Sequence, residues 1–211
     1  MKQYSEACEQ NRAPILAILR DAFAGRQNVL EIGSGTGQHA VYFASQLPHL
    51  RWFTSDLPTS HASINAWIDA AGLGNIERPL VLDVTRKQWP AQQFECVFSA
   101  NTTHIMSWPA VLEMFAGIGQ LLVPGGIFCL YGPFNYHHRF TSPSNERFDH
   151  WLKGRDPQSG IRNFEDLDRI ARENGLRLQA DHEMPVNNRL LVWMRPADPQ
   201  AQHSPSPSSS A

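Results

Sequence analysis

Residues 28–40, NVLEIGSGTGQHA, constrain the fold of this chain more than any other stretch. An apolar run ends at a glycine-rich turn, residues 33–37, and the turn opens into a segment with helical character. A buried strand that feeds a helix through glycines is typical of an open α/β sheet, because the missing side chains let bare backbone N–H groups lie beside a ligand. The turn therefore predicts a parallel sheet with a ligand site at its carboxyl edge.

The spacing of the glycines excludes two common ligands of such turns. The dinucleotide fingerprint G-x-G-x-x-G needs a glycine at the position that Gln38 occupies. A P-loop ends in Gly-Lys-Ser or Gly-Lys-Thr, and this turn contains no lysine. The pattern that remains is E-x-G-x-G-x-G, which begins at Glu31.

Acidic residues follow the next two apolar runs. Segment 50–56 is expected to form a second strand that ends at Asp56, and segment 79–84 a third strand with Asp83 at its end. Since the carboxyl ends of parallel strands meet at one edge of a sheet, both acids are expected beside the glycine turn, where the first can accept the ribose hydroxyls of a nucleoside. Each acid alone could equally be a turn residue or a helix cap.

Length and composition favour one globular domain over residues 1–196. The chain has 211 residues, of which 42% are hydrophobic and 18% charged, and its net charge is -2. This charge balance gives no indication of a nucleic-acid partner, and no apolar run approaches the length of a membrane span. The polar N-terminus does not resemble a signal peptide, and three cysteines fit reduced thiols, so we expect a cytoplasmic protein.

Strands and helices are expected to alternate along the chain. Further strands are predicted over 94–100, 126–134, 176–183 and 188–195, and helices over 5–24, 58–71, 109–122 and 163–173. A short turn joins the last two strands into an antiparallel hairpin. Residues 135–162 interrupt the alternation and are expected to form a lid or substrate-binding insertion, whereas residues 197–211 are expected to be a disordered tail.

Several segments together resemble a known family. The glycine turn is similar to motif I of the class I methyltransferases, which use S-adenosylmethionine (SAM). The whole chain resembles a small methyltransferase-like family of bacteria and eukaryotes, a domain of unknown function. The matching segments are EQNRAPIL, GSGTGQHAVYFA, NTTHI, YGPF, SPSNERFDHWLKGRDPQSGIRNFEDL and MPVNNRLLVW. In place of the methionine of the family's NMIHI-like segment this chain has Thr102 or Thr103, and it keeps His104.

The resemblance implies a Rossmann-like, doubly wound α/β fold with seven mostly parallel strands, the last antiparallel between its two predecessors, and SAM as the cofactor. Asp83 would face the adenine amine and the N–H of Val84 a ring nitrogen. A segment that precedes the first strand would cover the cofactor, although a surface ion pair is the alternative for Arg12. The expected cofactor-binding residues are Asn11, Arg12, Glu31, Gly33, Ser34, Gly35, Gly37, Asp56, Leu57, Asp83, Val84 and Asn101.

Methyl transfer from a sulfonium is an in-line displacement, so the alignment of the reacting atoms supplies much of the acceleration. A base is needed only where the nucleophile must lose a proton. We expect His104, after the fourth strand, to be that base, and Tyr131, at the end of the fifth, to donate a hydrogen bond into the pocket. The alternatives are that His104 only fixes its loop and that Tyr131 only packs.

The insertion supplies candidate substrate-binding residues. A helix through 145–152 would place Asn145, Phe148 and Asp149 on one face, because they are spaced three and four residues apart. Asn188, in the turn of the terminal hairpin, could reach the same pocket mouth or simply form the turn.

Two other features of the insertion have simpler explanations. An aromatic side chain that packs on the sheet is the expected role of Trp151. His137 and His138 are adjacent and have no companion ligand at a fixed spacing, so no metal site is expected.

These observations favour a SAM-dependent methyltransferase that acts on a small molecule at oxygen, nitrogen or sulfur. A protein that keeps the fold and binds SAM or a partner without turnover is an alternative, because function depends on the site and not on the fold. Methylation of protein or RNA is a third possibility, which a basic groove would favour and a closed pocket would disfavour.

Overall fold

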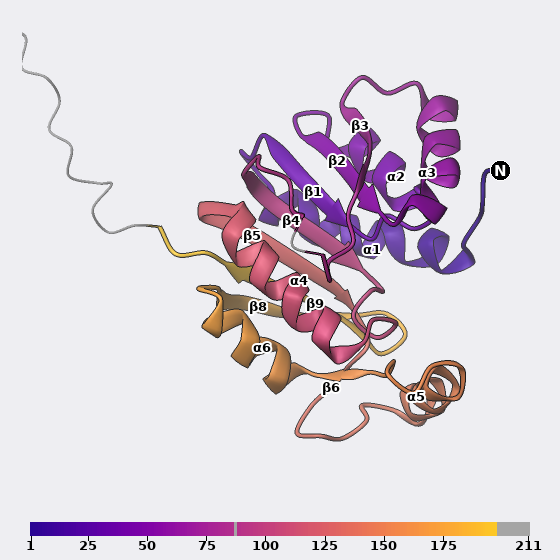
Figure 1. Cartoon of the computed structure of the whole chain (residues 1–211), viewed down its shortest axis with the longest axis vertical. Coiled ribbons are helices and arrows are strands. Elements are labelled where there is room, and N and C mark those ends of the chain that lie inside the picture. The colour runs from indigo at the N-terminus through magenta and orange to yellow at the C-terminus, as the bar shows by residue number, and fades with distance from the viewer. Residues whose placement is uncertain (87, 198–211) are drawn as a thin grey trace, which may run out of the picture.

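The computed structural model describes residues 1–86 and 88–197 and contains a seven-stranded sheet in the order β3-β2-β1-β4-β5-β9-β8 (Figure 1). The parallel strands pair as β3 with β2, β2 with β1, β1 with β4 and β4 with β5, and β9 lies antiparallel between β5 and β8. The predicted fold class is confirmed. The strands are β1 Asn28–Ile32, β2 Arg51–Asp56, β3 Ile76–Val81, β4 Phe94–Ala100, β5 Leu122–Gly132, β8 Arg177–Met184 and β9 Asn188–Met194.

Helices cover both faces of the sheet, α1, α2 and α3 on one side and α4 and α6 on the other (Figure 1). Side chains alternate along β1, so that Val29 packs with the first group of helices and Leu30 with the second. No helix in the described part of the chain is both long enough and apolar enough to cross a membrane. The helices are α1 Glu6–Ala22, α2 Gln38–Gln46, α3 Pro58–Ala71, α4 Trp108–Leu121 and α6 Phe164–Glu173.

The third strand differs from the prediction. It runs over Ile76–Val81 and not over 79–84, so Asp83 lies in the loop beyond the strand and not at its last residue. β3 is an edge strand that pairs with β2 alone. An edge strand tolerates a proline and exposed charges, because one side of its backbone needs no partner. Pro79 therefore lies inside the strand, whereas the apolar run alone placed the strand too late.

Pro14 neither starts nor breaks the first helix, because it lies inside α1. A proline in a helix interior removes one backbone hydrogen bond. The part of α1 after the proline is held by burial, since Ile15 and Leu19 are fully buried against the sheet. The residues before the proline lie at the carboxyl edge of the sheet and contribute to the site described below.

The insertion over 135–162 is a structured unit beside the sheet (Figure 1). Its helix is longer than the predicted 145–152 and begins after Ser142, whose Oγ accepts a hydrogen bond from the N–H of Asn145 at 3.1 Å. The two ends of the insertion are tied together by a short parallel pair of strands. These elements are β6 Phe134–Asn135, α5 Pro143–Arg155 and β7 Arg162–Asn163. The predicted tail lies outside the described residues from residue 198 onward.

Candidate active site

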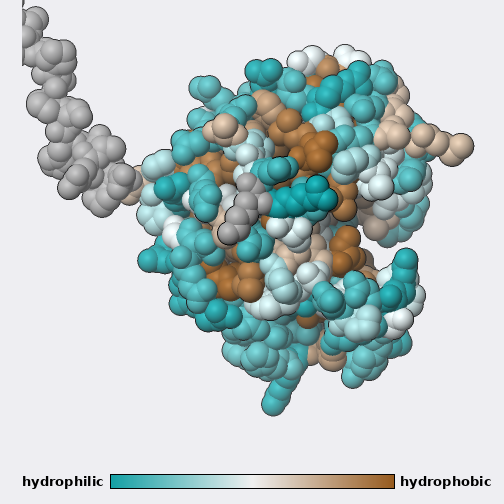
Figure 2. All heavy atoms as spheres, in the orientation of Figure 1, coloured by the Kyte–Doolittle hydropathy of each residue, from teal (hydrophilic) through white to brown (hydrophobic). Residues whose placement is uncertain are grey.

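A cavity of about 960 Å³ lies at the carboxyl edge of the parallel strands. Its walls come from the start of α1, the loops after β1, β2, β3 and β4, the helix α5 and the turn between β8 and β9. The molecule is hollowed between the part that contains α1–α3 and the part that contains α5, and brown apolar atoms are visible on the wall of this hollow (Figure 2). The cavity is thus at the point where the strand order reverses around β1, which is where open α/β sheets bind ligands.

The glycine turn after β1 forms one wall. Gly33 has a φ of 74°, and a Cβ on it would lie 2.6 Å from Cγ2 of Thr102, so only glycine lets the two loops approach. The backbone N–H groups of Gly33 and Ser34 both donate to the carbonyl of Ser55 at 3.0 Å. These two amides are therefore used within the protein, which corrects the expectation that the bare amides of the turn face the ligand.

Asp56 is fixed by three donors at the end of β2. One oxygen accepts from the N–H of Gly35 at 2.7 Å, and the other accepts from the N–H of Leu57 at 2.7 Å and from Ser60 Oγ at 3.0 Å. A carboxylate has about four acceptor positions, so one remains for a ligand hydroxyl. Asp56, Leu57 and Ser60 all line the cavity.

Asp83 lies across the same cavity, in the loop after β3. Its Oδ1 accepts from Thr85 Oγ1 at 2.7 Å and from the Thr85 N–H at 3.1 Å, and Arg86 Nε lies 3.2 Å from Oδ2. The hydrogen bonds from Thr85 and the charge of Arg86 hold the pKa of Asp83 below its usual value. The adjacent Val84 also lines the cavity.

Glu31 is not a wall of the cavity, which corrects its predicted role as a direct cofactor contact. Its carboxyl group is buried beneath the turn, where it accepts from Ser34 Oγ at 2.9 Å and from Trp52 Nε1 at 3.2 Å. Burial raises the pKa of Glu31 to about 7. Its position makes Glu31 a support for the turn.

Gly37 and Arg12 are also outside the cavity lining. Gly37 has a φ of 94°, and a Cβ there would lie 2.9 Å from Cα of Ile64, so this glycine allows α2 to pack on α3. Arg12 forms an ion pair with Glu9 and lies over the ring of Tyr42. The surface ion pair, the alternative for Arg12, is what the structure shows.

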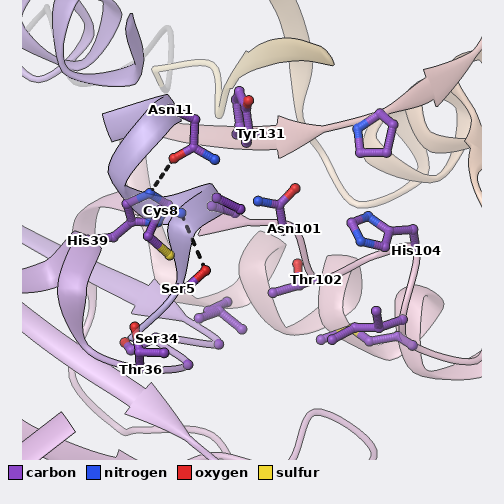
Figure 3. A pocket seen from close by; sticks show the side chains of 18 of the residues that line it. Ser5, Cys8, Asn11, Ser34, Thr36, His39, Asn101, Thr102, His104 and Tyr131 are labelled. Carbon is purple, nitrogen blue, oxygen red and sulfur yellow. Dashed lines mark hydrogen bonds between the residues drawn. The ribbon is translucent and has the colours of Figure 1, made fainter. Parts of the chain in front are cut away.

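The start of α1 closes one end of the cavity, and Asn11 there meets a residue that sequence reasoning missed. His39 Nε2 lies 2.6 Å from Asn11 Oδ1, and both side chains line the cavity (Figure 3). Burial lowers the pKa of His39 to about 4. Ser5 and Cys8, also missed, line the same end. Both residues precede the family-like segment EQNRAPIL and carried no sequence signal of their own, because α1 reaches the cavity through tertiary packing.

Tyr131 ends β5 and lies on the cavity wall, with its ring buried. Burial raises the pKa of its hydroxyl, and hydrogen bonds with Asn11 and Asn188 oppose this shift in part. Tyr131 therefore connects the start of α1 to the hairpin turn.

His104 lies at the other end of the cavity from His39, with Asn101 between them in the view of Figure 3. Asn101, with a φ of 58°, donates its N–H to the carbonyl of Tyr131 at 2.9 Å and starts the loop that carries His104. The side chain of His104 is 5% exposed, and its Nδ1 has no hydrogen-bond partner among the described residues. Burial, with a smaller effect of the charge on Arg162, lowers the pKa of His104 to about 4.

Helix α5 carries three candidate substrate-binding residues, and two of them line the cavity. Asn145 and Phe148 line the cavity, and the Phe148 ring lies edge-on to the His104 ring at 5.3 Å between centroids. Asp149 is outside the lining and is 1% exposed, because its carboxylate accepts from the N–H of Ile161 at 2.8 Å and binds Lys153 at 2.7 Å. Asp149 therefore ties α5 to the end of the insertion, which corrects its predicted substrate role.

Trp151 does not pack on the sheet, contrary to the expectation. Its side chain is 53% exposed and stacks on Phe148, and the guanidinium group of Arg155 lies over the Trp151 ring, 4.8 Å from its centroid.

Across residues 1–86 and 88–197, no group of three His, Cys, Asp or Glu residues is arranged to hold a metal ion. Among the described residues, the charged side chains that line the cavity are those of Asp56 and Asp83.

The strand order, the glycine turn and the two acids at the carboxyl edge together define the class I methyltransferase fold. The chain belongs to the family described as protein of unknown function DUF938, whose model matches residues 2–195. The resemblance found in the sequence is confirmed.

Solved structures share this fold at low sequence identity. An O-methyltransferase family protein from Burkholderia thailandensis matches with a TM-score of 0.79 and 17% identity, over 88% of this chain and 56% of that chain. The SAM-dependent methyltransferase SibL in its apo form matches with a TM-score of 0.75 and 23% identity, over 90% and 56%. The O-methyltransferase NcsB1 from neocarzinostatin biosynthesis, solved with SAM and 2-hydroxy-5-methyl naphthoic acid, matches with a TM-score of 0.75 and 14% identity, over 90% and 54%. This chain thus spans just over half the length of these proteins.

Proposed function

We propose that this protein is a SAM-dependent methyltransferase that acts on a small-molecule acceptor with an oxygen, nitrogen or sulfur nucleophile. The observation that carries the proposal is one cavity that has Asp56 and Asp83 at one part of its wall and a buried histidine, His104, at another. The structural neighbour from Burkholderia thailandensis is an O-methyltransferase family protein and the one from neocarzinostatin biosynthesis is an O-methyltransferase, which supports oxygen as the first nucleophile to test.

The cofactor would lie along the glycine turn. Asp56, with one acceptor position left, would bind one ribose hydroxyl, and Asp83 and the N–H of Val84 would bind the adenine. The start of α1 and Asn101 would enclose the remainder. Bound SAM supplies a methyl group that is already activated by its positively charged sulfur.

The protein's own residues would align the acceptor and remove its proton. His104 is uncharged at neutral pH because its pKa is about 4, so it can accept a proton through a ring nitrogen. In the proposed reaction an acceptor hydroxyl gives its proton to His104, its oxygen forms a bond to the methyl carbon, and the carbon–sulfur bond breaks. The products are the methyl ether and S-adenosylhomocysteine.

Binding and turnover test the proposal separately. Titration calorimetry with S-adenosylhomocysteine should show binding to the wild-type protein, and a His104→Asn variant should bind it with the same affinity. Labelled SAM with a metabolite extract should yield a labelled product, at a rate reduced about a hundredfold or more in His104→Asn. Absence of SAM and S-adenosylhomocysteine binding would contradict the proposal. Binding without transfer to any acceptor would favour the non-catalytic alternative.

A further inference from the structure

The part of the cavity around His104 has mainly apolar walls. Ile105 and Met106 follow His104 in its loop, Phe148 comes from α5, and Pro185 and Val186 come from the turn between β8 and β9. Ser144, Asn145 and Asn188 are the polar residues that α5 and the hairpin add to the cavity lining. Such a surface binds a flat apolar molecule that carries a few hydrogen-bonding groups.

Charge is distributed unequally in the cavity. Its charged side chains, among the described residues, are Asp56 and Asp83, and no described lysine or arginine lines it. Arg162 lies behind the loop of His104 and donates its hydrogen bonds to backbone carbonyls. An anionic acceptor would therefore lose its hydration without gaining a cationic side chain among the described residues that line the cavity. The walls select against carboxylates and phosphates.

The nature of the base limits the acceptor further. Burial makes His104 a weak base, and a weak base removes a proton more readily from a more acidic hydroxyl. A hydroxyl on an aromatic carbon, with a pKa of about 10 as in tyrosine, is far easier to deprotonate than an aliphatic alcohol. The edge-on contact of Phe148 with His104 places an aromatic wall directly beside the base.

We propose that the acceptor is an uncharged aromatic alcohol, whose ring lies between Phe148 and the hairpin turn and whose hydroxyl donates to His104. This inference rests on the proposed methyltransferase function and specifies its substrate class. The hydroxyl proton passes to His104, the aryl oxygen bonds to the methyl carbon, and the carbon–sulfur bond of SAM breaks, so that an aryl methyl ether and S-adenosylhomocysteine leave.

Three matched compounds test the substrate class: 2-naphthol, its carboxylated analogue 6-hydroxy-2-naphthoic acid, and the saturated alcohol decahydro-2-naphthol. Binding is measured by calorimetry on protein saturated with S-adenosylhomocysteine, and transfer is measured with labelled SAM. We expect 2-naphthol to bind and to be methylated, the carboxylate to bind about tenfold more weakly or worse, and the saturated alcohol to be methylated about a hundredfold more slowly than 2-naphthol.

A change of charge at the cavity rim provides a second test. Val186 lines the cavity, is 76% exposed, and has a φ of 59°, which a β-branched residue adopts at a cost. Val186→Lys adds the missing cation without disturbing the core, and Val186→Gln is the matched neutral control. We expect only the lysine variant to improve binding of the carboxylate, by about threefold to fivefold, with the effect lost at high salt.

The outcomes separate this inference from the function on which it rests. If the carboxylate binds the wild-type protein as tightly as 2-naphthol, or if 2-naphthol does not bind at millimolar concentration, the substrate class is wrong. Equal transfer rates for the aromatic and the saturated alcohol would also overturn it. If 2-naphthol binds selectively and no acceptor is ever methylated, the pocket preference stands and the methyltransferase function fails.

Discussion

Arg162 forms hydrogen bonds with the backbone of the loop that carries His104. Its Nε donates to the carbonyl of Thr103 at 3.0 Å, and its Nη2 donates to the carbonyls of Met106 and, at 2.9 Å, of Gln158. A further hydrogen bond holds the loop, because the carbonyl of His104 accepts from the N–H of Gly160 at 2.9 Å. The insertion thus contributes both the wall formed by α5 and the support for the candidate base.

The first prediction concerns the pKa of His104. Arg162→Gln removes a positive charge and admits water, and both changes favour the charged imidazole, so the pKa should rise from about 4 toward its ordinary value. NMR titration of the His104 ring protons measures this directly. Arg162→Lys is the control, because it keeps the charge but loses the three-way hydrogen bonding, and it should shift the pKa less. Unchanged titration in Arg162→Gln would show that the arginine has no electrostatic effect on the base.

The two acids of the cavity should control cofactor affinity. Asp56→Ala and Asp83→Ala each remove a charged acceptor, and hydrogen bonds to charged groups contribute about 1.5 to 3 kcal/mol, so S-adenosylhomocysteine should bind about tenfold more weakly or worse. Calorimetry provides the measurement. The control is Asp69→Ala, which breaks only the exposed pair with Arg78. Wild-type affinity in both cavity variants would remove the basis for the assignment of the adenosine site.

The buried His39 predicts acid-sensitive stability. Its folded pKa of about 4 lies below the unfolded value of about 6.5, so its contribution is fully present above pH 6.5 and is lost as the pH falls toward 4. At pH 5 the loss should be about 2 kcal/mol relative to neutral pH. In His39→Gln the glutamine can still donate to Asn11 but cannot titrate. The loss of unfolding free energy between neutral pH and pH 5 should therefore be about 2 kcal/mol smaller in this variant than in the wild-type protein.

Urea unfolding at both pH values provides this measurement, and the exposed His150→Gln is the control. His104 is buried as well and should keep part of the acid sensitivity in the His39 variant. An identical pH dependence in the wild-type protein and in His39→Gln would contradict the prediction.

Gly33 should be intolerant of any side chain. Gly33→Ala combines the positive φ with a Cβ placed 2.6 Å from Cγ2 of Thr102, and we expect a loss of about 2 kcal/mol or more in unfolding free energy. Adding Thr102→Ser removes the clashing methyl group and keeps the hydroxyl that bonds to Ser99, so it should recover part of the loss. Gly74→Ala is the control, since nothing lies near its Cβ position. Full stability of Gly33→Ala would show that the two loops can separate freely.

The order of strands and helices could be predicted well from the sequence, because each element leaves a local pattern. Glycines at 33, 35 and 37 all adopt positive φ, and the apolar run before them is the buried strand β1. The hairpin turn over residues 184–187 and the helix start at Pro58 were also visible locally. The predicted position of β3 is wrong because an edge strand tolerates proline and charged residues, so its sequence pattern is less distinct than that of a central strand.

The direction of individual side chains could be predicted much less well. Asp149 has the same sequence spacing as Asn145 and Phe148 but turns toward Ile161, since the N–H of that residue is buried and needs an acceptor. Trp151 lies on an exposed face of α5. Glu31 precedes the turn in the chain yet lies beneath it. For Asp149 and Glu31, a partner that fixes the carboxylate is 12 or 21 residues away in the sequence.

The chain therefore encodes its class of fold and the place of its ligand site in short stretches of residues, because glycine conformation, strand alternation and strand-end acids are local properties. Tertiary packing alone brings His39 against Asn11, Arg162 behind the loop of His104, and the carboxyl groups of Glu31 and Asp149 away from the cavity. The hydrogen bonds of His39 with Asn11, of Asp149 with Ile161 and of Arg162 with Thr103 join residues 12 to 59 positions apart in the chain. Such pairings depend on the shape of the folded molecule, and no local pattern records them.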